Sequence, residues 1–121
     1  MVPASRPPQT TPDAGAMTTF DEREKDFEAR FKHDQELQFK VTARRNRLLG
    51  LWAAERMGLA GDAAQAYARE VVDAQYQGGD RHVADKLVAD LAAKGQPSTA
   101  AQVKFELDHF ADQAKQQIMQ E

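Results

Sequence analysis

One long stretch, residues 19–57, restricts the fold most, because it contains no proline and a single glycine, Gly50. Residues that favour a helix dominate it, and Thr19 and Glu22 have the spacing of a capping box, which begins many helices. At about 1.5 Å per residue, a helix of this length measures roughly 57 Å. The sequence therefore predicts a single long helix that begins at Thr19.

Glycines divide the rest of the chain into shorter segments. The pair Gly78–Gly79 and the single Gly95 interrupt a sequence that is otherwise typical of helices. No stretch alternates between apolar and polar residues with a period of two, so no sheet is expected. Three further helices are expected, over residues 62–77, 80–94 and 97–119.

The apolar residues of these segments recur with the spacing of helix faces that pack in a bundle. The second half of the long helix contributes Leu48, Leu49, Leu51 and Trp52. The later helices contribute Tyr67, Val71, Val72, Val83, Leu87, Val88, Leu91, Val103, Leu107, Phe110, Ala114 and Ile118. The sequence thus predicts an all-α fold, a small four-helix domain with a long first helix.

The lengths of the helices divide the chain further. The two shorter helices measure about 24 Å and the last about 32 Å, so a bundle of that height cannot cover the whole first helix. We expect the bundle over residues 37–119 and a mobile projecting arm over residues 17–36. Residues 1–16 hold four of the five prolines and are expected to be a disordered leader. A second interpretation is that the native chain begins at Met17.

The arm carries a narrow aromatic stripe. Phe20, Phe27 and Phe31 follow at intervals of 7 and 4, and lie within about 40° of one another around a helix. Acidic and basic residues alternate closely among them. Such a stripe is typical of a helix that binds in a groove of a partner. The stripe could instead pack back onto the bundle, but the length argument favours a partner site.

Composition argues against several classes of function. The chain has no cysteine, which excludes disulfides, thiolate catalysis and cysteine-based metal sites. Neither Ser5 nor Ser98 lies in a nucleophile motif, and the three histidines are not spaced as a metal pair. We expect no enzymatic activity, no catalytic residue, no metal and no cofactor.

Charge and hydropathy restrict the partners. The net charge is −3, and Arg44, Arg45 and Arg47 form the only basic cluster, so nucleic acid is not an expected partner. No apolar run approaches the roughly 18 residues of a transmembrane helix, and no secretory signal is visible. We therefore expect a cytoplasmic protein that does not insert into the membrane.

Two segments resemble a known family. The opening MTTFDEREKDFEARF from Met17 and the block RRNRLLGLWAAE from Arg44 are similar to the zeta subunit of the alpha-proteobacterial F1-ATPase, and the resemblance covers residues 17–119. It implies a four-helix regulatory inhibitor of ATP hydrolysis by the F1 sector of a bacterial ATP synthase. The N-terminal arm would insert between the catalytic subunits and the central rotor, and would block hydrolytic rotation while largely sparing synthesis.

The resemblance also assigns residues and partners. The partner-binding residues of the inhibitory arm would be Phe20, Asp21, Arg23, Glu24, Lys25, Phe27, Glu28 and Phe31. Secondary docking or structural roles would fall to Arg44, Arg45, Asn46, Arg47 and Trp52. The partners would be the catalytic subunits and rotor subunit of F1, with the protein a monomer when free and peripheral on the membrane-bound synthase. The family is also associated with weak adenine-nucleotide binding, although this sequence has no glycine-rich phosphate loop.

Two other functions stay open. The chain could be a helical adaptor or small-ligand (nucleotide) module of the same family without strong inhibition. It could also bind nucleic acid through the basic cluster, and that binding would depend strongly on salt. Co-purification with ATP synthase followed by an ATPase assay would separate these alternatives.

Overall fold

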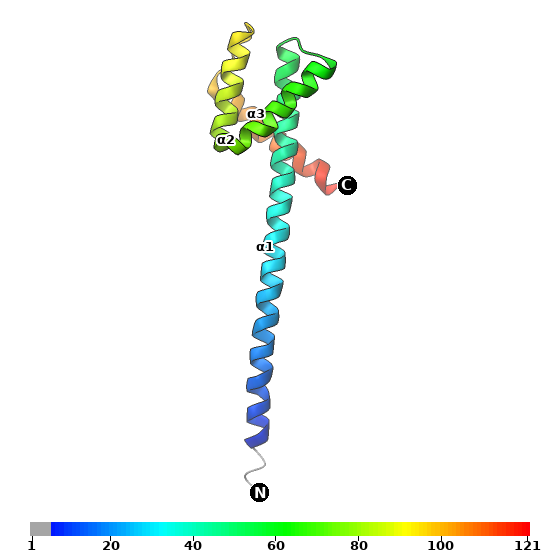
Figure 1. Ribbon diagram of the computed structural model, residues 1–121, viewed down its shortest axis with the longest axis vertical. Helices are drawn as coiled ribbons and strands as arrows, with labels where there is room; N and C mark the ends of the chain where they lie inside the picture. The colour runs from blue at the N-terminus through cyan, green and yellow to red at the C-terminus, as the bar shows by residue number, and fades with distance from the viewer. Residues whose placement is uncertain (1–5) are drawn as a thin grey trace. The chain divides into compact units, whose positions relative to one another are not determined.

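The computed structural model describes the backbone of residues 6–121 and the side chains of Lys25 and of residues 28–121. Within residues 6–121 it contains three helices, α1 (Arg6–Arg56), α2 (Gly61–Ala93) and α3 (Ala100–Met119), and no strand (Figure 1). The all-helical prediction is confirmed. The chain divides into two units, Met1–Leu37 and Gln38–Glu121, each of which is described by itself.

α1 begins at Arg6, well before the start that the sequence predicted at Thr19. Pro7 and Pro8 fall within the first turn, where proline is tolerated because the backbone N–H groups there have no partner inside the helix. Residues 1–5 of the expected leader lie outside the described residues. The disorder of residues 1–16 and the mobility of residues 17–36 stay predictions.

α2 reverses direction at Gly78 and Gly79 (Figure 1). Their backbone angles are not helical, and the φ of 73° at Gly79 lies in a region that residues with a side chain rarely adopt. The reversal divides α2 into a first limb, residues 61–77, and a second limb, residues 80–93. The sequence predicted a break at this pair. Because no loop separates the two limbs, the expected count of four helices is not confirmed.

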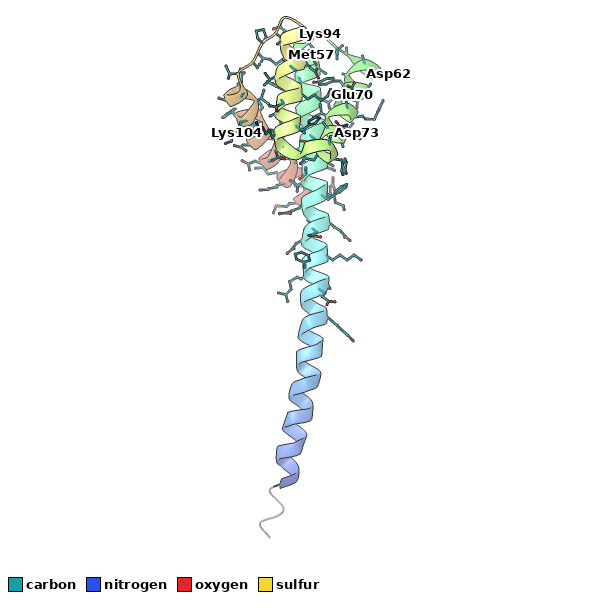
Figure 2. The ribbon with its side chains drawn as sticks, turned by 60° about the vertical axis from the view of Figure 1, so that its left-hand side comes forward. Met57, Asp62, Glu70, Asp73, Lys94 and Lys104 are labelled. Atoms are coloured by element: carbon teal, nitrogen blue, oxygen red, sulfur yellow. The ribbon has the colours of Figure 1, made fainter. Side chains whose placement is uncertain are left out.

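The two limbs of α2 lie antiparallel, side by side. The Tyr67 hydroxyl donates to Asp90 Oδ2 at 2.8 Å, and Lys86 Nζ lies 3.2 Å from Glu70 Oε1. Figure 2 shows Glu70 on the first limb and Lys94 at the far end of the second. These bonds join residues about equally far from the glycine pair, as a helical hairpin requires.

The core of the unit Gln38–Glu121 lies between the C-terminal half of α1, both limbs of α2, and α3. Leu49, Val71, Leu87 and Val103 have no exposed surface. Each belongs to an apolar face that the sequence predicted, so the location of the core is confirmed. Burial of a side chain of this size stabilises the fold by about 1.5–3 kcal/mol.

α1 crosses the first limb of α2 at small residues. Gly50 is buried, and a Cβ built on it would lie 2.7 Å from the Cα of Ala68. Ala53 and Ala54 are also fully buried. Of the four larger residues that the sequence placed in this part of the core, Leu49 is fully buried and three are only half-buried: Leu48, Leu51 and Trp52. At Gly50 the helices approach so closely that a side chain cannot lie between them.

α3 begins at Ala100, three residues after the start at residue 97 that the sequence predicted. The Thr99 hydroxyl accepts a hydrogen bond from the backbone N–H of Gln102 at 3.1 Å, which satisfies one of the unpaired donors at the start of a helix. Val103, Leu107 and Ala114 form its buried face. None of the helices described in residues 6–121 has an apolar stretch long enough to cross a membrane.

Candidate functional site

The predicted arm lies in the unit Met1–Leu37. Its described side chains are Lys25 and residues 28–36, and all of them are exposed. Phe31 has 56% of its surface exposed. An aromatic ring that is exposed among charged residues offers apolar surface that a partner can bury.

The arm residues of the prediction divide by what the structure describes. Lys25, Glu28 and Phe31 are exposed, as residues that meet a partner would be. The backbone of the other five is helical in α1, and their side chains lie outside the described residues: Phe20, Asp21, Arg23, Glu24 and Phe27. The partner-binding role of all eight stays a prediction.

Arg45 and Asn46 lie in a polar network against α2. Arg45 is 9% exposed and Asn46 is fully buried. Arg45 Nη2 donates to Gln75 Oε1 at 3.0 Å and to Asp80 Oδ1 at 2.9 Å. Asn46 Nδ2 donates to Gln75 Oε1 at 2.9 Å. Both residues are occupied by hydrogen bonds inside the protein, which leaves them poorly placed to dock a partner.

This network spans the reversal of α2. Gln75 precedes the glycine pair and Asp80 follows it, and Gln75 Nε2 donates to Asp80 Oδ1 at 3.0 Å. The hydrogen bonds from Arg45 and Gln75 hold the pKa of the Asp80 carboxyl below its usual value. The side chains of α1 therefore bind both limbs of α2 at the point where the chain turns.

Of the other residues of this block, Arg47 is exposed, and Arg44 and Trp52 are half-buried. Arg44 forms an ion pair with Glu121, and Arg47 Nη2 donates to Gln65 Oε1 at 3.3 Å. Trp52 is half-buried against the core, with the guanidinium of Arg56 5.1 Å from the centre of its ring. The sequence treated this block as one group, but its residues lie in three environments: the buried network, the surface and the edge of the core. Only Arg44 and Arg47 present charge at the surface.

A second polar network joins the limbs of α2, and sequence reasoning missed it. Burial, followed by the hydrogen bond to Asp90, raises the pKa of the Tyr67 hydroxyl. Burial by itself would lower the pKa of the Lys86 ammonium, but hydrogen bonds to Asp90 and Glu70 outweigh it and raise that pKa. Both shifts favour the protonated form of the group, the neutral hydroxyl of Tyr67 and the charged ammonium of Lys86.

Beside this network lies an open hollow lined by Glu70, Asp73, Gln77, His82 and Lys86. It does not suit a phosphate, because Lys86 is already paired with Glu70 and Asp90. Among the described side chains, no three histidine or carboxylate groups come together as a metal site requires. This hollow therefore offers little to a nucleotide.

A different hollow lies between α1 and the first limb of α2. It consists of two adjoining pockets that share Phe39, Ala43 and Val72, with Tyr76 lining the smaller one, and we call the two together the aromatic hollow. The rings of Phe39 and Tyr76 are tilted at 43° with their centres 6.0 Å apart, and they are 56% and 66% exposed. Sequence reasoning did not single out these two residues, because they lie far apart in the chain.

Comparison with known proteins supplies a family. The sequence profile described as ATPase inhibitor subunit zeta matches residues 17–117. A solved structure titled "Solution NMR structure of the protein" is 41% identical over 69% of this chain and 96% of its own, with a TM-score of 0.62. The search of curated proteins found no match.

Proposed function

Because the chain belongs to the ATPase inhibitor subunit zeta family, we propose that it inhibits ATP hydrolysis by the F1 sector of a bacterial ATP synthase. The arm, residues 17–36, enters between the catalytic subunits and the central rotor. The observation that carries the proposal is the family match over residues 17–117, which includes the whole arm. The exposure of Lys25, Glu28 and Phe31 supports it.

The arm acts as a wedge in this proposal. Rotary hydrolysis needs the interfaces of the catalytic subunits to open and close, so a helix lodged between them and the rotor stops the cycle. Charges of both signs along the arm orient it in the site and exclude incorrect positions.

The energetics of the arm suggest that it does not act alone. Burial of three phenylalanine side chains gives roughly 5–9 kcal/mol before costs. Ordering a segment on binding takes back about 2–5 kcal/mol. The remainder corresponds to modest affinity, since each 1.4 kcal/mol changes a dissociation constant about tenfold. Tight inhibition therefore needs additional contacts, either from the arm's charges or from the unit Gln38–Glu121.

The proposal is tested by titration of purified F1 with the protein while steady-state ATP hydrolysis is measured. We expect the hydrolysis rate to fall to a plateau as the protein saturates F1. In membrane vesicles, ATP synthesis driven by a proton gradient should fall much less.

A second candidate is a binding module of the same family that does not inhibit. It predicts a different result in the same titration, namely saturable binding to F1 with an unchanged hydrolysis rate. A protein that neither binds nor inhibits F1 would refute both candidates.

A further inference from the structure

The aromatic hollow has the features of a docking surface on the unit Gln38–Glu121. Tyr76 is 66% exposed and Phe39 is 56% exposed, although most large apolar side chains of this unit lie in the core. The floor of the hollow is formed by Ala43 and Val72, which are half-buried. The two rings pack on each other with their centres 6.0 Å apart, so a single apolar side chain could rest on this floor against their exposed faces and displace water.

Charge around the aromatic hollow indicates what its occupant carries. Lys40, Arg44 and Arg47 line the larger pocket of the hollow together with Glu121, beside the pocket that Tyr76 lines, so three cationic side chains meet one carboxylate. This is a basic surface on a chain whose net charge is −3. The Arg44–Glu121 ion pair leaves the charges of Lys40 and Arg47 unbalanced by any carboxylate among the residues that line the hollow. An occupant with carboxylates beside an apolar residue complements this surface.

We propose that the aromatic hollow is a second docking site for F1, which takes an apolar side chain flanked by carboxylates from a subunit of the F1 sector. This inference rests on the proposed function. It is one source of the additional contacts that tight inhibition requires. The hollow secures the protein on F1, and the arm blocks rotation.

The variant that tests the hollow is Tyr76→Ser in the full-length chain. Tyr76 is highly exposed, so its replacement removes one aromatic ring of the hollow without opening a cavity in the core. The matched control is Phe105→Ser on α3, since Phe105 is also 66% exposed and does not line the hollow. Thermal melts should confirm that both variants fold as the wild type does.

A second pair of variants tests the charge. Lys40→Glu reverses a cation that lines the hollow, while Lys104→Glu reverses an exposed lysine on α3 (Figure 2). Lys40→Glu should weaken binding to F1 at low salt, and its difference from wild type should shrink as salt rises. Lys104→Glu, like the control Phe105→Ser, should bind F1 as tightly as wild type does.

Binding to F1 and maximal inhibition are measured separately. We expect Tyr76→Ser to raise the dissociation constant by about tenfold or more, as loss of an aromatic anchor does. Inhibition at saturating protein should be unchanged, because the arm is intact. If Tyr76→Ser binds F1 as tightly as wild type and Phe105→Ser do, the hollow is not a docking site, and the proposed inhibition by the arm still stands.

Two other outcomes would also overturn the inference. Sedimentation of the free protein could reveal a dimer that Tyr76→Ser dissociates, and the hollow would then bind a second copy of the chain. A wild-type protein that neither binds nor inhibits F1 would refute the proposed function, and the docking site with it.

Discussion

Arg45 Nη2 on α1 lies 2.9 Å from Oδ1 of Asp80, the residue that follows the reversal of α2. The guanidinium is almost fully buried, whereas the Asp80 side chain is 65% exposed. One ion pair thus connects α1 to the second limb, and Gln75 connects the same guanidinium to the first limb. Because a buried guanidinium without partners is costly, this network favours a single angle between the limbs.

Replacement of Asp80 by Ala should lower the free energy of unfolding by about 1–2 kcal/mol. Loss of a partner from a buried ion pair costs more, about 3–5 kcal/mol, but solvent screens an exposed carboxylate. Urea unfolding at neutral pH measures the change. Asp85→Ala, at an exposed carboxylate in the same limb, is the control and should change stability little. Equal stability of the two variants would show that the ion pair contributes nothing.

The same carboxyl should make stability depend on pH. The pKa of Asp80 is lowered in the folded protein from its usual 3.8, so its contribution is present above that value. The contribution is lost as pH falls from about 4 through the lower folded pKa, where the carboxyl takes up a proton. The difference between wild type and Asp80→Ala should therefore shrink at acid pH. A difference that stays constant down to pH 2 would contradict this cause.

Gly50→Ala should lower the melting temperature. The added Cβ would lie 2.7 Å from the Cα of Ala68, so α1 and α2 must move apart, at a cost of typically about 1–3 kcal/mol. Helix propensity acts in the opposite direction and favours alanine by about 1 kcal/mol. The sign of the shift in a thermal melt decides which effect is larger. A higher melting temperature would mean that the helices do not approach as closely as described.

Leu87→Ala should destabilise the unit Gln38–Glu121 by about 2–5 kcal/mol, because it leaves a cavity in a fully buried part of the core. Leu107→Ala should act similarly from α3. The control is Leu37→Ala, since Leu37 is 36% exposed. Chemical denaturation compares the three variants. Leu87→Ala and Leu37→Ala with equal stability would place the core elsewhere.

The sequence predicts the core better than it predicts the polar contacts. Leu87 and Leu107 each belong to a row of apolar residues that recurs with helical spacing, so the core faces could be predicted. The glycine pair Gly78–Gly79 interrupts a helical sequence, so the break there could be predicted as well. Arg45 gave no such signal. Its partners lie 30 and 35 residues later, and only the folded chain brings them within hydrogen-bond distance.

Two further features depend on tertiary contacts. A residue as small as Gly50 is needed for packing only because another helix passes close by. The periodicity of the sequence does not describe the distance between helices. Phe39 and Tyr76 belong to different helices, so neither one indicates a hollow by itself. The aromatic stripe of the arm was visible in the sequence because all its members share one helix.

Phe27→Ala should weaken the inhibitory complex with F1 about thirtyfold, which corresponds to a loss of about 2 kcal/mol in binding free energy. Phe27 is the central member of the stripe by its spacing in the sequence, and its side chain lies outside the described residues. Arg23→Glu should weaken inhibition less, and the loss should depend more on salt. Titrations of ATP hydrolysis at two salt concentrations compare them. A larger loss with Arg23→Glu would show that charge, not the stripe, binds the partner.

The most direct test of the account compares ATP hydrolysis by F1 in the presence of the full-length protein and of a variant that lacks residues 17–34. The core residues of the unit Gln38–Glu121 all follow the deletion, and circular dichroism should confirm that both proteins are helical. We predict that the full-length protein suppresses hydrolysis and that the deletion variant does not, even at concentrations that saturate F1. Equal inhibition by the two proteins would contradict the account, because the unit Gln38–Glu121 would then be the inhibitor.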